Sequence, residues 1–155
     1  MAFTLSSPAF DDGDDIPARY TCDGENRSPE LRWNDPPIGT KAFALIVEDP
    51  DAPSGMFTHW ILTDIPGTES TLAEAIAPGR VGVDGVNTYS KIGYGSPCPP
   101  RGHGVHRYYF RLHALKDFMR LHGKITREII DPRLSELSLG EAVLMGRYAR
   151  TAARR

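Results

Sequence analysis

The first half of the chain contains two apolar runs that predict strands. Residues 42–48 are apolar except for Glu48 and lead into an Asp-Pro turn at Asp49. A run of that length is typical of a central strand that is buried on both faces of a sheet. Residues 59–63 form a second run, which ends before Pro66. We therefore expect two strands separated by turns, because Asp-Pro and Pro-Gly pairs favour turns over regular pairing.

Residues 106–115 alternate between two sets of side chains, which is the pattern of a strand with two different faces. The first set is His106, Tyr108, Phe110, Leu112 and Ala114, and the second is Arg107, Tyr109, Arg111 and His113. The first set is mainly apolar, so we expect it to face the core, with His106 at the start of a row of core side chains. The second set, which includes the two arginines, is expected to face solvent.

The last third of the chain has a helical pattern. Residues 126–131 predict a short helix that stops before Pro132, because the residue before a proline is biased away from helical geometry. Ser138 and Glu141 have the spacing of a capping box, and small or apolar residues follow at roughly helical intervals from Leu139 onward. Strands first and helices last predict an α+β fold, or an all-β sandwich with helices docked at its end.

The size and charge of the chain narrow the class of protein. The chain has 155 residues, so we expect residues 1–155 to form a single domain. Lys and Arg total 18 and Asp and Glu total 20, for a net charge of −2. This balance argues against nucleic acid or an anionic membrane as a partner attracted by overall charge. The 15 glycines and 13 prolines indicate many turns.

Two cysteines, Cys22 and Cys98, are too few for a disulfide-rich secreted fold. The N-terminal residues show no signal peptide, and no stretch of about 18 apolar residues is present to span a membrane. We therefore expect a cytoplasmic protein that is not an integral membrane protein. Reduced thiols are the default in that compartment, although a Cys22–Cys98 bridge stays open.

Two segments bring ionisable side chains and prolines together. The first contains Asp49, Asp51 and His59, and the second runs from residue 97 to His106 and Tyr108. Asp49 and Asp51 are two positions apart, so in an extended stretch their side chains would point to the same side. Proline stiffens both segments, and rigid loops at strand ends are common places for binding sites.

The aspartates and histidines are compatible with three kinds of site. The first is a metal site of two histidines and one carboxylate, which has loose spacing rules and is the least favoured. The second is general acid–base chemistry, although no G-x-S-x-G nucleophile elbow accompanies it. The third is a small pocket in which imidazole, tyrosine and backbone donors bind an anion while the aspartates hold the donors in place.

Structural roles explain the same residues equally simply. Asp49 would then cap its turn, and His59 and His106 would be satisfied structural residues. His103, His113 and His122 are expected to have no part in a site. Trp33 and Trp60 are expected in the core, with a place in the pocket wall as the alternative for Trp60.

The two segments resemble the signature regions of the phosphatidylethanolamine-binding protein family, which includes the Raf kinase inhibitor protein. The matching stretches are Asp49-Pro50-Asp51-Ala52-Pro53, His59-Trp60-Ile61-Leu62-Thr63, Gly95-Ser96-Pro97-Cys98-Pro99-Pro100 and His106-Arg107-Tyr108-Tyr109-Phe110. Further similarity at Tyr20-Thr21-Cys22-Asp23-Gly24 and at residues 144–148, the latter typical of the compact bacterial and archaeal branch, extends the resemblance over nearly the whole chain.

The resemblance implies a mainly β fold, namely a two-sheet antiparallel β-sandwich with short peripheral and C-terminal helices. It also implies an anion pocket, with no catalytic residue, no metal and no cofactor. The residues that it places in the pocket or on its wall are Asp49, Asp51, His59, His106, Pro53, Trp60, Pro99, Pro100 and Tyr108. The family pattern further implies a cis bond between Ala52 and Pro53.

The expected function is therefore non-enzymatic binding of phosphate- or carboxylate-bearing ligands. Such a ligand would be a phospholipid head group or a phosphorylated partner, and inhibition of a kinase or a protease is part of this expectation. The alternative is a hydrolase that uses Asp and His as an acid–base pair. Homodimerisation is expected from the resemblance to short prokaryotic members of the family.

Overall fold

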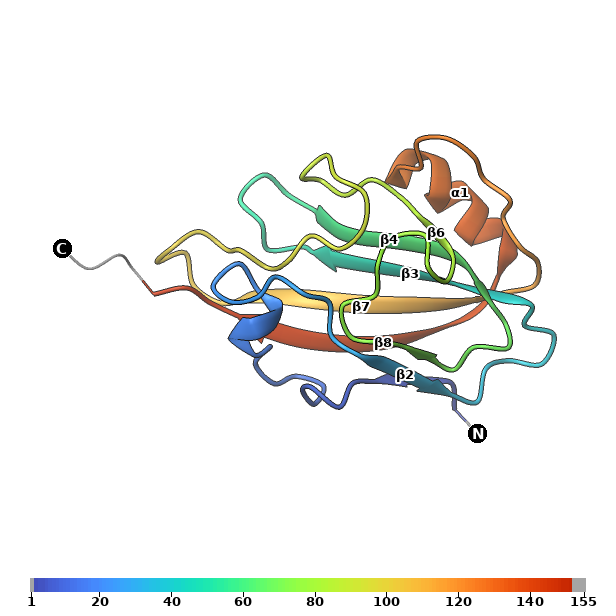
Figure 1. Ribbon diagram of the computed structural model, residues 1–155, viewed down its shortest axis with the longest axis horizontal. Helices are drawn as coiled ribbons and strands as arrows, with labels where there is room; N and C mark the ends of the chain where they lie inside the picture. Colours follow the sequence, from blue (N-terminus) through green and yellow to red (C-terminus); the bar gives the residue numbers. More distant parts are fainter. Residues whose placement is uncertain (1, 152–155) are drawn as a thin grey trace.

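The computed structural model describes residues 2–151 and contains two antiparallel sheets and one α-helix (Figure 1). The larger sheet has the strand order β6-β4-β3-β7-β8, with bounds Val83–Asp84, Phe57–Pro66, Ala42–Asp49, His106–Leu115 and Ser138–Tyr148. The smaller sheet has the order β1-β2-β5, with bounds Thr4–Ser6, Leu31–Asn34 and Thr71–Leu72. A short 3-10 helix spans Ala18–Tyr20, and α1 spans Arg127–Leu137.

Strand β3 is central in the larger sheet and is buried along its whole length, as its apolar run predicts. Its alternate residues belong to two different hydrophobic clusters. Phe43, Leu45 and Val47 face the smaller sheet, whereas Ala44 and Ile46 pack with the buried residues of α1. The helix and the smaller sheet therefore cover opposite faces of the larger sheet (Figure 1).

The two faces of β7 are also confirmed. The residues from His106 to Ala114 that were expected to face the core are all buried. Arg107 is exposed, and the rest of the other face is half-buried. His113 is less exposed than predicted, because it lies beside Glu141 of β8, 3.3 Å from its carboxylate. Burial lowers the pKa of His113.

The predicted C-terminal helix is wrong, because residues 138–148 form strand β8. The strand pairs with β7 along nearly its whole length, from Leu115 opposite Ser138 to His106 opposite Tyr148. Its buried positions are Ala142, Leu144 and Gly146, which is the two-residue period of a strand. Tertiary pairing with an adjacent long strand therefore overrides the capping-box signal.

The predicted stop before Pro132 is also wrong, since α1 continues through that proline to Leu137. Proline removes one backbone hydrogen bond from a helix interior. Ile130, Leu134 and Leu137 are buried against the larger sheet, and this packing offsets the loss.

Two covalent expectations are corrected as well. Cys22 and Cys98 form a disulfide, so the two thiols are not free. No cis peptide bond occurs within residues 2–151, so the Ala52–Pro53 bond is trans. No helix of the described part of the chain is both long enough and apolar enough to cross a membrane.

Candidate functional site

Three strands of the larger sheet bring the predicted residues to one edge. Because β3 runs antiparallel to both of its neighbours, its last residue lies beside the first residues of β4 and β7. Asp49 ends β3 and is opposite Phe57 of β4, and His106 begins β7. Residues that are far apart in the sequence, Asp49 and His106, therefore meet at this edge.

A β-bulge in β4 sets the direction of the His59 side chain. Val47 pairs with Trp60 and Glu48 pairs with Thr58, so His59 is an extra residue without a partner on β3. Trp60 faces the interior of the sandwich. In a regular strand its neighbour His59 would face the opposite side. The bulge turns His59 back to the interior side, where its ring lies 5.2 Å from the ring of Tyr108.

Asp49, His106 and His103 form a chain of short hydrogen bonds. Nδ1–H of His106 donates to Oδ2 of Asp49 at 2.6 Å, and both side chains are almost fully buried. The other ring nitrogen of His106, Nε2, lies 2.6 Å from Nδ1 of His103, which is hydrogen-bonding distance. His103 itself is exposed and sits between Gly102 and Gly104, whose φ angles of 75° and 97° favour glycine.

His59 is buried and donates its Nδ1–H to the carbonyl oxygen of Gly95 at 2.7 Å. Burial lowers the pKa of the His59 imidazole, while the Gly95 hydrogen bond and the Asp49 carboxylate oppose that change. The neutral ring therefore dominates at neutral pH, with Nε2 as the nitrogen that remains for a ligand. Tyr89 packs edge-on to His59 at 5.8 Å, and its hydroxyl donates to the Ser96 carbonyl at 2.9 Å.

These side chains surround a cavity of about 240 Å³ at the sheet edge. The cavity is lined by Asp49, Ala52, Pro53, Ser54, Phe57, His59, Tyr89, Cys98, Pro99, Pro100, His106 and Tyr108. The Tyr108 hydroxyl is buried and has no hydrogen-bond partner among the residues that the structure describes. Burial raises the pKa of this phenol, so the hydroxyl keeps its proton and is available as a donor.

Seven of the nine predicted site residues line this cavity, and Asp51 and Trp60 do not. Asp51 accepts two hydrogen bonds from the Arg107 guanidinium, at 2.8 and 2.9 Å, on the outer side of the sheet edge. Trp60 lies in the core, where its indole N–H donates to Asp84 at 3.2 Å. Residue type alone placed Trp60 in the core, whereas the family resemblance placed it in the pocket or on its wall, and Trp60 does not line the cavity.

Sequence reasoning missed six residues that belong to this region. Ala52, Ser54, Phe57, Tyr89 and Cys98 line the cavity, and His103 extends the chain of hydrogen bonds from Asp49. Phe57 lies two positions before the predicted strand at residues 59–63. Cys98 lies within the proline-rich segment that leads to His106. Tyr89 comes from a loop with no pattern that marks it, so only the fold reveals its place.

The metal alternative can be compared with the geometry. Within residues 2–151 no group of three or more His, Cys, Asp or Glu side chains is arranged to hold a metal ion. The Nδ1 atom of each pocket histidine already donates, to Asp49 in His106 and to Gly95 in His59. The arrangement leaves Nε2 of His59 as an acceptor in the neutral ring, and this nitrogen becomes a hydrogen-bond donor when the ring is protonated.

Arg107 should control the protonation of Asp51. The hydrogen bonds from Arg107 lower the pKa of Asp51 from 3.8 to about 2. The stability that this contact contributes is therefore present above 3.8 and is lost as the pH falls toward 2. We expect Arg107→Gln to raise the pKa of Asp51 toward 3.8, as measured by NMR of the carboxyl carbon. Arg111→Gln is the control, and an equal rise there would contradict the assignment.

The fold and the site together define a two-sheet β-sandwich with a small cavity, lined by two histidines and an aspartate among apolar residues, at the end of strands β3, β4 and β7. The family model described as phosphatidylethanolamine-binding protein matches residues 6–149. The chain belongs to the phosphatidylethanolamine-binding protein family.

Several relatives cover most of the chain. A UPF0098 protein of Methanothermobacter thermautotrophicus is 45% identical over 94% of this chain and 98% of its own length. A UPF0098 protein of Aquifex aeolicus is 43% identical over 93% of this chain and 86% of its own length. A Mycobacterium tuberculosis protein that carries the name lipoprotein LppC is 38% identical over 94% of this chain and 71% of its own length.

Two solved structures share the fold. The family homologue CT736 of Chlamydia trachomatis superposes with a TM-score of 0.89 at 38% identity, covering 96% of this chain and 98% of its own. YbcL of Escherichia coli, described as a new member of the mammalian family, has a TM-score of 0.89 at 29% identity and covers 96% of this chain and 99% of its own. The β-sandwich expectation is therefore confirmed, with β8 in place of a C-terminal helix.

Proposed function

We propose that this protein binds small phosphate- or carboxylate-bearing ligands in the cavity between Asp49, His59 and His106, without catalysis. Family membership supports a binding protein in general. The observation that carries the finer proposal is Tyr108, which lines the cavity and whose buried hydroxyl has no partner within residues 2–151. An unpartnered buried hydroxyl costs about 1–3 kcal/mol, and a ligand oxygen that accepts from it would recover this free energy.

The histidines are held so that each has one ring nitrogen committed to the protein. His59 donates Nδ1–H to Gly95, and His106 donates Nδ1–H to Asp49. The second nitrogen of either ring becomes a donor to an anion when that ring is protonated. In His106 this nitrogen faces His103, which must move aside or be replaced by a ligand oxygen.

Anion binding should therefore strengthen as the pH falls. An anion in the cavity favours the charged form of His59, so binding takes up a proton and opposes the lowering of the His59 pKa by burial. We expect the affinity for acetate, whose own charge is constant over this range, to rise about tenfold between about pH 8 and pH 6, as measured by calorimetry in two buffers of different ionisation heat. An affinity that rises with pH would contradict this prediction, as would His59→Gln with an unchanged pH profile.

The sharpest test of the site removes one oxygen atom. Tyr108→Phe deletes the unpartnered hydroxyl and leaves the ring, so folding stability should hold or increase while phosphate affinity falls about fivefold or more. Tyr109→Phe is the matched control, because Tyr109 is next in sequence and points to the other face of β7. Phosphate, phosphoethanolamine and acetate as probes separate phosphoryl from carboxylate preference. Equal affinities of both variants would overturn the proposal.

Recognition of a protein partner would use the same cavity. A kinase or a protease would be bound through a phosphorylated or carboxylate-bearing side chain, and a phospholipid through its head group. A phosphoserine peptide compared with the same unmodified peptide tests the first route, and vesicles with and without phosphatidylethanolamine test the second. Phosphate that displaces either partner supports one shared site.

The hydrolase alternative and the assembly expectation have their own measurements. Turnover of p-nitrophenyl phosphate or p-nitrophenyl acetate that Asp49→Asn abolishes would favour catalysis over binding. Sedimentation equilibrium tests the expected homodimer. The cytoplasmic location expected from the sequence differs from the location that the name of one relative, a lipoprotein, indicates for that relative. Fractionation of the source cells would show where this protein is found.

A further inference from the structure

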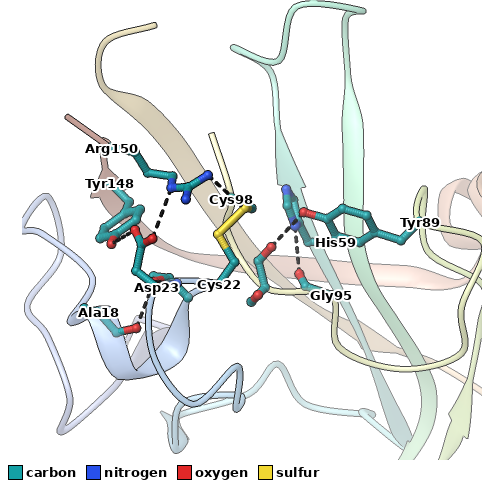
Figure 2. The surroundings of a disulfide bond; sticks show 11 residues. Ala18, Cys22, Asp23, His59, Tyr89, Gly95, Cys98, Tyr148 and Arg150 are labelled. Atoms are coloured by element: carbon teal, nitrogen blue, oxygen red, sulfur yellow. Dashed lines mark hydrogen bonds and ion pairs between the residues drawn. A yellow bond between two sulfur atoms is a disulfide. The ribbon is translucent and has the colours of Figure 1, made fainter. Parts of the chain in front are cut away.

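The Cys22–Cys98 disulfide (Figure 2) contributes to the lining of the anion cavity and of a second, larger cavity. Cys98 lines both cavities and precedes Pro99 and Pro100 of the first cavity's wall. Cys22 lines only the second cavity and is exposed, whereas Cys98 is half-buried. Cys22 is therefore the more exposed residue of the pair.

The second cavity has a volume of about 420 Å³ and is lined by both polar and aromatic residues. Its lining residues besides the two cysteines include Asn26, Lys91 and Tyr89. Lys91 is exposed and makes no ion pair within the described part of the chain. The cavity thus offers a small molecule access to the disulfide and a cation for a carboxylate that it carries.

Arg150 distinguishes the two sulfur atoms chemically. Its Nη1 lies 3.5 Å from Sγ of Cys98, and its Nε donates to Asp23 at 3.1 Å (Figure 2). Asp23 is held in turn by the Tyr148 hydroxyl at 2.5 Å. Only 19% of the Arg150 side chain is exposed, so the guanidinium is positioned rather than free. A guanidinium beside a sulfur atom stabilises the thiolate that forms there.

We infer that the Cys22–Cys98 disulfide is a thiol-exchange site for small thiols that carry a carboxylate. The thiolate enters the second cavity and attacks Sγ of Cys22, forming a new S–S bond. The Cys22–Cys98 bond breaks, and its electron pair leaves on Sγ of Cys98 as a thiolate beside Arg150. The product is a mixed disulfide on Cys22. The reverse attack by Cys98 on Sγ of Cys22 expels the small thiol and restores the bridge, so atoms and electrons balance in both directions.

Exchange should also affect the anion cavity, an extension that rests on the proposed function. The bridge links residues that are 76 positions apart, and its loss frees the segment that carries Pro99 and Pro100. Two contacts remain, from Cys22 N–H to the Pro97 carbonyl at 3.1 Å and from the Tyr94 hydroxyl to the Tyr20 carbonyl at 2.8 Å. We expect local loosening without global unfolding, so that exchange weakens phosphate binding and bound phosphate slows exchange.

The primary experiment uses the oxidised native protein and a matched pair of thiols, 3-mercaptopropionate and 2-mercaptoethanol, with rates corrected to equal thiolate concentration. Mass spectrometry should locate the adduct on Cys22. Lys91→Gln should slow the carboxylate thiol about threefold or more relative to the neutral thiol. An adduct on Cys98, or an equal effect of Lys91→Gln on both thiols, would overturn the inference.

The role of Arg150 is tested with single-cysteine variants. In Cys22→Ser the Cys98 thiol should alkylate at lower pH than the Cys22 thiol does in Cys98→Ser, and Arg150→Gln should abolish this difference. In the intact disulfide, Arg150→Gln should slow exchange about threefold per unit of change in thiol pKa. Arg101→Gln, at a nearby exposed arginine, is the control, and equal slowing in both variants would contradict the assignment.

Calorimetry with phosphate on the oxidised protein and on the mixed disulfide completes the test. Weaker binding by the mixed disulfide supports the link between the two cavities, and equal binding overturns that link alone. No binding by the oxidised protein would instead count against the proposed function, and the exchange rates would still decide the thiol site.

Discussion

Asp49→Ala should lower the free energy of unfolding by about 3 kcal/mol or more, because it leaves a buried hydrogen-bond donor without a partner. Asp49 is 2% exposed and accepts from His106 at 2.6 Å and from the backbone N–H of Asp51 at 2.7 Å. The same substitution should abolish measurable phosphate binding, since it releases His106 from its orientation. Urea unfolding followed by fluorescence measures the first effect, and calorimetry measures the second.

Asp51→Ala is the matched control for this prediction. Asp51 is also an aspartate that accepts hydrogen bonds from a side chain of β7, but its partner Arg107 is 48% exposed. Exposed pairs contribute about 0–1 kcal/mol, so the control should change stability little. Equal losses in the two variants would show that burial of the Asp49–His106 pair is not what makes it important.

Gly146→Ala should destabilise the protein by about 1–3 kcal/mol through overpacking. A methyl group at this position of β8 would lie 2.8 Å from Cε2 of Phe10 and 2.9 Å from Cδ1 of Ile16. Phe10 and Ile16 belong to the N-terminal segment that covers this part of β8. The midpoint of thermal unfolding should fall, as measured by calorimetry.

Gly140→Ala provides the comparison within the same strand. A methyl group there would meet only the Pro37 ring within 4 Å, at 3.2 Å. That contact is near the surface, so the ring can shift and the cost should be small. A Gly140 variant less stable than the Gly146 variant would contradict the proposed packing of the N-terminal segment on β8.

Strands with a strong local pattern were predictable, and strands defined by their partner were not. The unbroken apolar run of β3 and the alternation of β7 reflect burial that is written into each segment. In β8 the buried residues are Ala142, Leu144 and Gly146, two of which are small. Small residues carry a weak periodic signal, so only the long pairing with β7 makes this segment a strand.

The site was predictable as a meeting of two segments but not in its details. Asp51 was expected to share a side with Asp49, but β3 ends at Asp49. Oδ1 of Asp49 accepts the backbone N–H of Asp51, which turns the chain and sends the second carboxylate outward. The strand period therefore no longer applies. The contact of His103 with His106 was not predicted, because it depends on the path of a loop in which glycines flank His103.

The Cys22–Cys98 disulfide was not predicted, for a different reason. Reduced thiols were the default because the compartment inferred from the N-terminal residues favours them. Whether Cys22 and Cys98 can meet depends on the loop geometry around them, which sequence does not encode locally. The fold brings them together beside the cavity wall.

The unpaired position of His59 between Trp60 and Thr58 has a consequence for changes in chain length. Removing this one residue would let β4 pair regularly with β3 at Val47 and Glu48, so the ladder would survive a deletion that empties one wall of the pocket. Inserting a residue elsewhere in β4 would instead reverse the facing of every side chain beyond it. Recognition and sheet integrity are therefore separable at this single position, and a natural or engineered deletion there would produce a folded scaffold without its ligand.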